Sequence, residues 1–133
     1  MRARGFVDVL IPRGSADLIQ TVVRESTVPV IETGAGVVHI VLDATADEQL
    51  AVDIVHNAKV QRPSVCNAVE TVLVHRDAAD RVLPPVLAAL RASGVVVRGD
   101  ARARAVDSDL LPATDDDYST EHMALELNVA VVD

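Results

Sequence analysis

The 133 residues are enough for one domain of ordinary size, and their composition already excludes several classes of protein. Half of the residues are hydrophobic, yet only Phe6 and Tyr118 are aromatic, so the core must be built from aliphatic side chains. A net charge of -8 with so few aromatic rings argues against a nucleic-acid-binding protein, which needs basic patches and stacking platforms.

Cysteine content and hydropathy bear on where the protein works. A single cysteine cannot form a disulfide within the chain, which favours a reducing compartment. The first residues, 1–5, are not followed by the apolar stretch of a secretory signal. No apolar run approaches the roughly 18 residues of a membrane-spanning helix. We therefore expect a cytoplasmic protein without membrane association.

Predicted strands and helices alternate along the chain. Residues 98–120 are mostly polar and predict a loop region. Strands separated by helices imply an α/β fold with a mainly parallel sheet and helices on both faces. Apolar runs predict the strands at 6–11, 28–31, 37–42, 71–75, 95–97 and 124–132.

Three helices are predicted from their caps and apolar stripes. Ser15 is a favourable N-cap for the first. Thr45, with a glutamate three residues later, predicts a capping box for the second, which runs to about Gln61. The main part of the third is expected to begin at Pro84 or the proline after it, and Gly94 is a suitable residue just past its end.

Cys66 is the candidate nucleophile. It lies in a polar connection between a predicted helix and a predicted strand, and such loops commonly carry catalytic residues. Lys59 and Arg62 are near in sequence and would favour the thiolate, while the N–H groups after the cysteine would receive a developing oxyanion. A lone cysteine is also a common buried hydrophobe, so the residues alone leave both interpretations open.

Other motifs carry little signal. The glycines of residues 34–36 lack the third glycine of a dinucleotide-binding fingerprint. No zinc-site spacing joins the four histidines, so no metal site is expected. These histidines are His39, His56, His75 and His122.

Three stretches together resemble one family. Residues 58–75 (AKVQRPSVCNAVETVLVH) resemble the active-site segment of gamma-glutamyl phosphate reductases, which are also called glutamate-5-semialdehyde dehydrogenases. Residues 7–14 (VDVLIPRG) and the stretch 120–133 are similar to two further segments of that family, in the same order. The family belongs to the aldehyde dehydrogenase superfamily, so the resemblance implies an aldehyde-dehydrogenase-like catalytic domain.

The resemblance implies an NADPH-dependent reductase of proline biosynthesis. In that family, the residue at Cys66 would attack gamma-glutamyl phosphate, expel phosphate and hold the glutamyl group as a thioester. Reduction by NADPH would then give glutamate 5-semialdehyde. Asn67 and Arg62 would bind the substrate, and Glu121 would contact the nicotinamide ribose. Glu32 stands where aldehyde dehydrogenases place their general base, although this reductase family often has no acid there.

The resemblance also implies that the chain is a fragment of a much longer protein. Residues 1–32 would end the cofactor-binding domain, and residues 33–133 would form most of the thiol-bearing catalytic domain, which is incomplete. Because the main NADPH-binding part is absent, we expect the isolated chain to show little or no turnover. The full-length protein is expected to be a homo-oligomer and to associate with glutamate 5-kinase.

Two other functions remain open. The chain could come from another thiol aldehyde dehydrogenase that oxidises a free aldehyde, in which case Glu32 would be a required base. It could instead be a non-catalytic oligomerisation module derived from the enzyme, in which case Cys66 would be inert.

Overall fold

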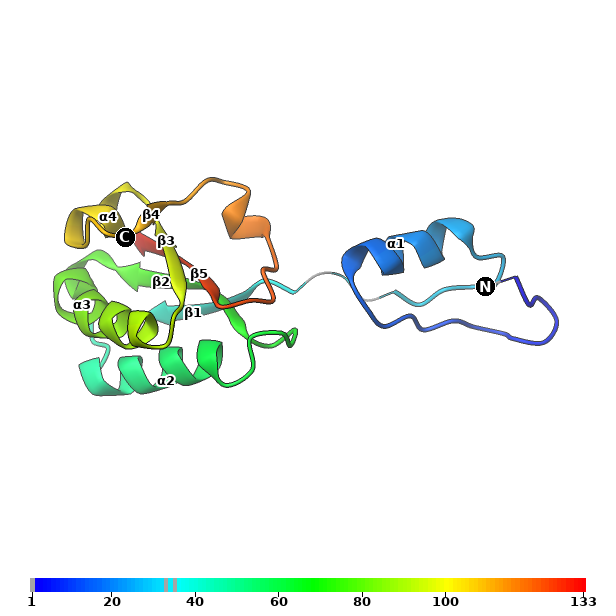
Figure 1. The fold of residues 1–133 in the computed structure, drawn as a ribbon, viewed down its shortest axis with the longest axis horizontal. Helices are drawn as coiled ribbons and strands as arrows, with labels where there is room; N and C mark the ends of the chain where they lie inside the picture. The colour runs from blue at the N-terminus through cyan, green and yellow to red at the C-terminus, as the bar shows by residue number, and fades with distance from the viewer. Residues whose placement is uncertain (1, 33, 35) are drawn as a thin grey trace. The chain divides into compact units, whose positions relative to one another are not determined.

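The computed structural model describes residues 2–32, 34 and 36–133, and the chain forms two compact units (Figure 1). The first unit spans residues 1–35 and the second spans residues 36–133. The division expected from the sequence, after residue 32, lies three residues earlier. Assigning the first unit to a cofactor-binding domain stays a prediction. Residues 33 and 35, in the predicted glycine loop, lie outside the described residues.

The first unit is built around helix α1 (Ala16–Glu25). The Ser15 side chain accepts a hydrogen bond from the N–H of Leu18, so the predicted N-cap is confirmed. On either side of the helix, Leu10 and Val30 form an isolated parallel bridge. The segments 6–11 and 28–31, which were predicted as strands, therefore pair only through an isolated bridge. Each of the two segments has a partner on one side only, which is too little to stabilise a regular strand.

Much of the apolar surface of the first unit is open to solvent. Ile19, Val22 and Val28 are buried. Phe6 and Ile31, in contrast, are 94% and 59% exposed. Large exposed apolar patches on a small unit mark surfaces that pack against other protein.

The second unit is a five-stranded parallel sheet with the strand order β1-β2-β5-β3-β4. β5, the last strand in sequence, is inserted at the centre of the sheet (Figure 1). The strands are β1 (Val38–Leu42), β2 (Val69–His75), β3 (Val96–Gly99), β4 (Leu111–Pro112) and β5 (Glu126–Val132). The helices are α2 (Glu48–Val60), α3 (Arg76–Ala92), α4 (Ala101–Val106) and the short 3-10 helix η1 (Asp117–Ser119).

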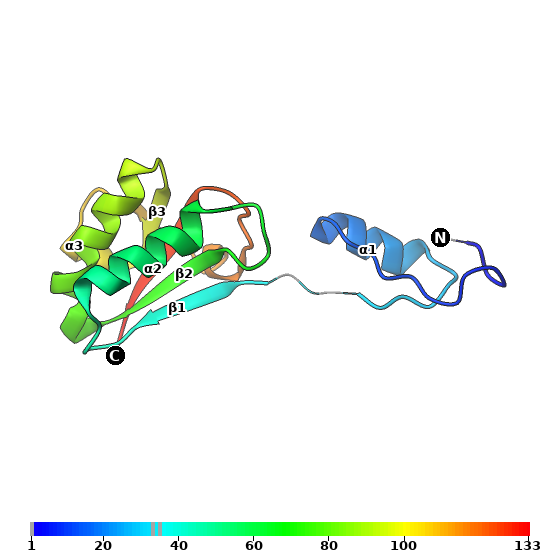
Figure 2. The same ribbon diagram turned by 90° about the horizontal axis from the view of Figure 1, so that it is seen from below.

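The α-helices of the second unit gather on one face of the sheet. The connections from β1 to β2, β2 to β3 and β3 to β4 all step in the same direction, and right-handed crossovers then place α2, α3 and α4 on the same side. Figure 2 shows α2 and α3 side by side on that face. The opposite face carries no α-helix in the described part of the chain, and on β1 its Val41 is 65% exposed. The parallel sheet is as predicted, but α-helices cover one face instead of two.

The N-cap of helix α2 lies two residues later than the predicted Thr45. Asp47 is its N-cap, because the Asp47 carboxylate accepts a 2.8 Å hydrogen bond from the N–H of Leu50. Thr45 instead donates to Asp43, at 3.2 Å, in the preceding turn. The predicted end of the helix at Gln61, which is the C-cap, is correct.

Helix α3 runs without a break through its two prolines. It begins at Arg76, and His75 caps it by accepting a hydrogen bond from the N–H of Asp77. The predicted restart at Pro84 is therefore wrong. Gly94, with φ of 75°, follows the helix end as predicted. The prolines are tolerated because buried side chains hold the helix to the sheet on both sides of them: Val82, Leu83, Val86, Leu87 and Leu90.

Residues 98–120 are more structured than their polarity indicated. The end of β3, helix α4, strand β4 and η1 all lie there. Asp100 starts α4 as its N-cap by accepting a 2.7 Å hydrogen bond from the N–H of Ala103. An aspartate followed by alanines and arginines is a cap signal that the polar composition concealed.

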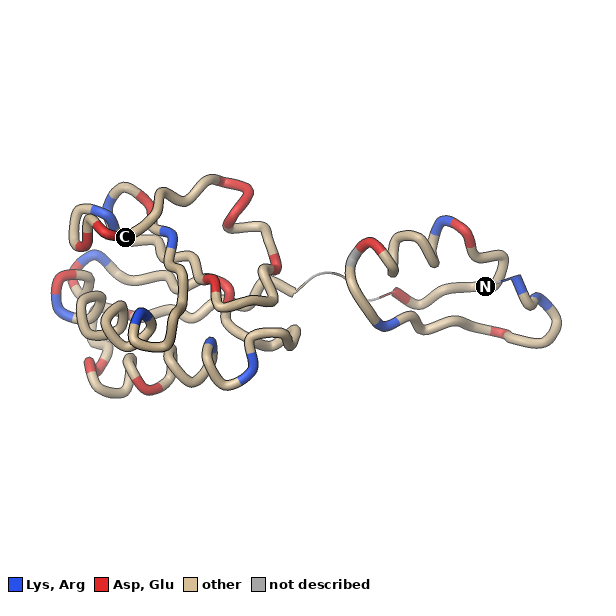
Figure 3. Tube along the Cα trace, viewed as in Figure 1, with Lys and Arg blue, Asp and Glu red and all other residues tan. Residues whose placement is uncertain are grey.

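The distribution of charged residues and the hydropathy of the helices can be described on the structure. Acidic and basic residues are interspersed over the second unit (Figure 3). No helix in residues 2–32, 34 and 36–133 is both long enough and apolar enough to cross a membrane.

Replacing Leu87 by Ala tests the assigned core. Leu87 is fully buried in α3, so the truncation should lower the free energy of unfolding by about 2–5 kcal/mol. Leu50→Ala on α2 is the matched control, because that leucine is 57% exposed, and it should change the same quantity by less than about 0.5 kcal/mol. Urea denaturation of the purified chain measures both. Equal losses would contradict the assigned packing.

Candidate functional site

Three loops meet at one edge of the sheet, the amino edge, where parallel strands begin. β1, β2 and β5 are neighbours and run in the same direction, so the segments that enter them lie side by side. Those segments carry Gly36, Cys66 and Glu121. The topology therefore brings two sequence-predicted site residues, Cys66 and Glu121, to the same edge.

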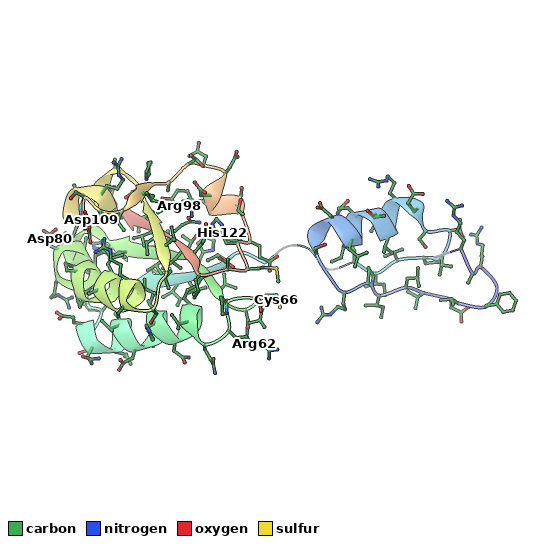
Figure 4. The ribbon with its side chains drawn as sticks, in the orientation of Figure 1. Arg62, Cys66, Asp80, Arg98, Asp109 and His122 are labelled. Atoms are coloured by element: carbon green, nitrogen blue, oxygen red, sulfur yellow. The ribbon has the colours of Figure 1, made fainter. Side chains whose placement is uncertain are left out.

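Cys66 is exposed in the loop that joins α2 to β2. The loop is folded into turns, because Ala68 N–H donates to the Val65 carbonyl at 2.9 Å and Val65 N–H donates to the Arg62 carbonyl at 3.4 Å. Arg62 and Asn67 are exposed in the same loop. Figure 4 shows Arg62 and Cys66 at the same end of the second unit. Of the two interpretations of a lone cysteine, the buried hydrophobe is excluded.

A glycine separates the Cys66 loop from Glu121. A Cβ placed on Gly36 would lie 3.3 Å from the carbonyl oxygen of Cys66 and 3.9 Å from Oε1 of Glu121. Glycine at this position therefore lets the backbone pass close to the Cys66 loop, with the half-buried Glu121 carboxylate beside it. A carboxylate accepts hydrogen bonds, so it suits a ligand that presents hydroxyl groups.

A buried ion pair lies under the amino edge. Lys59 Nζ donates to Oε2 of Glu70 at 2.9 Å and to the carbonyl of Val69 at 2.9 Å. The side chains of Lys59 and Glu70 are 0% and 1% exposed. Oε1 of Glu70 accepts a 3.2 Å hydrogen bond from the N–H of Met123. One carboxylate thus joins the end of α2, the start of β2 and the segment that follows Glu121.

The expectation that Lys59 favours the thiolate of Cys66 is wrong, because its ammonium group is buried against Glu70 and Val69. The sequence contained a signal for this pair. Ala51, Val55 and Lys59 follow one another at helical spacing and form the buried side of α2. Glu70 is an acidic residue within a mostly apolar and buried strand. A lysine on the buried side of a helix and an acid in a buried strand are expected to pair, because burying an unpaired charge is costly.

A second set of contacts holds the segment before Glu121 onto the sheet. Arg98 on β3 pairs with Glu126 at 2.5 Å and with Asp117 at 3.6 Å. Asn128 Nδ2 donates to the Asp117 carbonyl at 2.7 Å. The Tyr118 hydroxyl donates to a β5 carbonyl, that of Val129, at 3.1 Å. Glu121 therefore lies between two anchored points, Asp117 before it and Met123 after it.

Glu32 belongs to the first unit, where its side chain is exposed. Its part in the chemistry as a general base stays a prediction. In the described residues no group of three or more His, Cys, Asp or Glu side chains converges as a metal site.

The sequence is similar to known enzymes along its whole length. All 133 residues align at 68% identity with the gamma-glutamyl phosphate reductase of Clavibacter michiganensis subsp. michiganensis and at 65% identity with that of Leifsonia xyli subsp. xyli. The alignments cover 31% and 32% of those proteins, so the chain spans about a third of the length of the curated relatives. No protein-family profile matches the chain.

Solved structures show the same relationship. The crystal structure of gamma-glutamyl phosphate reductase from Thermotoga maritima matches 98% of this chain and 32% of that one, with a TM-score of 0.91 and 45% identity. An acetylating aldehyde dehydrogenase from Geobacillus thermoglucosidasius matches 97% of this chain and 36% of that one, with a TM-score of 0.65 and 14% identity, which shows the fold alone. The predicted aldehyde-dehydrogenase-like fold class is confirmed.

Tyr118 offers a direct test of how its segment is packed. Partial burial raises the pKa of its phenol, and the nearby charges of Asp100, Asp117 and Asp115 add to the effect. The chain has one tyrosine and no tryptophan, so absorbance at the phenolate band reports this residue alone. The titration midpoint should lie above the value of about 10 found in the unfolded chain.

The sign of the stability effect follows from that shift. The folded state binds the phenol proton of Tyr118 more tightly than the unfolded chain does. Its contribution to the free energy of unfolding is therefore complete below the unfolded pKa and is lost as the pH rises through the folded pKa. Tyr118→Phe removes the absorbance signal and serves as the control. Identical midpoints in the folded protein and in urea would contradict the packing of Tyr118 against β5.

Proposed function

The whole chain corresponds to about one third of a gamma-glutamyl phosphate reductase, the family that its motifs indicated, and on that premise we propose that it carries the nucleophile of an NADPH-dependent reductase. The reaction would convert gamma-glutamyl phosphate to glutamate 5-semialdehyde and phosphate, a step of proline biosynthesis. The observation that carries the proposal is the exposed thiol of Cys66 on the amino edge, in the loop beside Glu121.

Cys66 begins the proposed reaction. Its thiolate attacks the carbonyl carbon of the acyl phosphate, and the thiol proton passes to water. A sulfur–carbon bond forms while the carbon–oxygen bond to phosphate breaks, and phosphate leaves with the electron pair. Because phosphate is a good leaving group, this step needs no dedicated acid, and covalent attachment divides the reaction into two easier steps.

The same loop supplies groups that suit the substrate. Gamma-glutamyl phosphate is an anion, and the exposed guanidinium of Arg62 matches phosphate and carboxylate groups. Asn67, directly after Cys66, carries an amide that can donate to the carbonyl oxygen as negative charge develops on it. Both roles are proposals from position and chemistry.

Glu121 fits a nicotinamide cofactor. Its carboxylate lies beside Gly36 and the Cys66 loop and can accept hydrogen bonds from ribose hydroxyls. NADPH, when bound there, would supply the hydride that reduces the thioester carbon. Cleavage of the carbon–sulfur bond then releases the semialdehyde and restores the thiolate of Cys66.

The surroundings of the reaction also enter as proposals. An acyl phosphate hydrolyses readily in water, which favours its direct transfer from glutamate 5-kinase to this enzyme. We place the full-length homo-oligomer in the cytoplasm, where a free thiol stays reduced.

Replacement of Cys66 and Glu32 in the full-length protein tests the proposed function. Cys66→Ala should lower kcat by at least about a thousandfold, because the thioester cannot form. Its melting temperature should change little, since the side chain is exposed. Steady-state oxidation of NADPH measures the activity.

Glu32→Gln separates reduction of an acyl phosphate from oxidation of a free aldehyde. Under the proposal no general base is needed at this position, so most of the activity should remain. An enzyme that requires Glu32 as its base would lose about 10²–10⁴-fold. That loss, or full activity of Cys66→Ala, would overturn the proposed function.

A further inference from the structure

Glu70 is a buried carboxylate that the proposed reaction does not use, and we propose that it is a positioning residue for the amino edge. It would fix the separation between the Cys66 loop and the Glu121 segment by accepting a hydrogen bond from the backbone of Met123. The proposal rests on the proposed function, since it assigns Glu70 a part in aligning the residues that act there.

Lys59 and Glu70 together close the Cys66 loop. Lys59 is in the last turn of α2, and both of its partners, Val69 and Glu70, are the first two residues of β2. Cys66 lies between these points in the chain. The two 2.9 Å contacts from one ammonium group therefore fix the ends of the loop and reduce the conformations open to it.

Met123 connects the same carboxylate to the other segment. Its φ of 52° lies in the left-handed region, which side chains other than glycine rarely adopt. Such a conformation persists only where the surroundings enforce it. The 3.2 Å hydrogen bond from its N–H to Oε1 of Glu70 is an interaction that does so. The backbone direction between Glu121 and β5 is thus set by Glu70.

Glu121 is held from both sides as a result. Upstream, the Asp117 carbonyl accepts from Asn128, and downstream, Met123 donates to Glu70. The His122 ring also lies 3.2 Å from Asn128 Nδ2, so loss of the Met123 contact would remove the backbone hydrogen bond on the downstream side and leave that side-chain contact. Glu121 and the Cys66 carbonyl both lie within 4 Å of the position that a Cβ of Gly36 would occupy. A shift of either segment therefore changes how Cys66 and Glu121 lie relative to each other, and the proposed reaction needs both.

A pair of double variants separates positioning from the burial of charge. Lys59→Met/Glu70→Gln and Lys59→Met/Glu70→Met both remove the two buried charges, and an apolar replacement of a buried ion pair is often tolerated. The glutamine keeps an oxygen that can accept from Met123, whereas the methionine does not. The two proteins thus differ mainly in the proposed contact.

Hydrogen exchange of residues 120–125, measured by mass spectrometry on the full-length protein without cofactor, is the first measurement. Exchange should be at least about tenfold faster in the Glu70→Met form than in the Glu70→Gln form, because the segment opens locally. The second measurement is kcat/KM for NADPH, which should fall by at least about tenfold in the same comparison, since misplaced groups lose alignment.

A variant elsewhere controls for general destabilisation. Asp107→Asn weakens the ion pair that Asp107 forms with Arg91 at 2.7 Å, a pair that involves neither the Cys66 loop nor residues 120–125. It should leave exchange in 120–125 unchanged. Equal exchange, or equal kcat/KM per folded molecule, in the two double variants would overturn the positioning role.

Two further variants cover the remaining outcomes. If the Glu70→Met form does not fold, Glu70→Gln alone still carries the test. Glutamine keeps an oxygen that can accept from Met123, so hydrogen exchange in residues 120–125 should rise no more than in the rest of the sheet. A larger rise in residues 120–125 would overturn the positioning role of Glu70. Cys66→Ala, assayed in parallel, distinguishes the two proposals. Full activity of Cys66→Ala refutes the proposed function. If Cys66→Ala is inactive while the Glu70 variants do not differ in exchange or in kcat/KM, only the positioning role of Glu70 is refuted.

Discussion

The ion pair between Lys59 and Glu70 is the constraint on which the arrangement of the amino edge depends. Burial of two charges is costly, and it is offset only where the remaining hydrogen-bonding capacity is also satisfied. Here the Val69 carbonyl and the Met123 N–H supply those further partners. The pair therefore joins the two ends of the Cys66 loop, and through Met123 it ties the Glu121 segment to them.

The position of the candidate nucleophile is unusual for a parallel sheet. Ligands of open α/β sheets commonly bind beyond the carboxyl ends of the strands, whereas Cys66 and Glu121 precede their strands. At the carboxyl edge of this unit, exposed side chains form ion pairs with one another. Arg76 and Arg102 both pair with Asp133, at 3.3 and 3.0 Å, and lower the pKa of that carboxyl. The amino edge is where a thiol is left exposed.

Local signals predicted the fold well where one interaction decides the outcome. Ser15, the end of α2 at Gln61 and the buried β5 strand are such cases. Prediction failed where tertiary packing overrides local preference, as when α3 passes through its prolines. At the candidate site, Cys66 was indicated by its loop and by the family resemblance, and Glu121 by the resemblance alone. The contact of Glu70 with Met123 spans 53 residues, and no local pattern encodes it.

A covalent intermediate on Cys66 is the central claim, and its detection is the most direct test. Gamma-glutamyl phosphate can be generated from glutamate and ATP by glutamate 5-kinase beside the full-length protein, without NADPH. After acid quenching and digestion, mass spectrometry of the Cys66 peptide is expected to show the added mass of one glutamyl group, removable by hydroxylamine. An unmodified Cys66 peptide, from protein that turns over once NADPH is added, would contradict the claim.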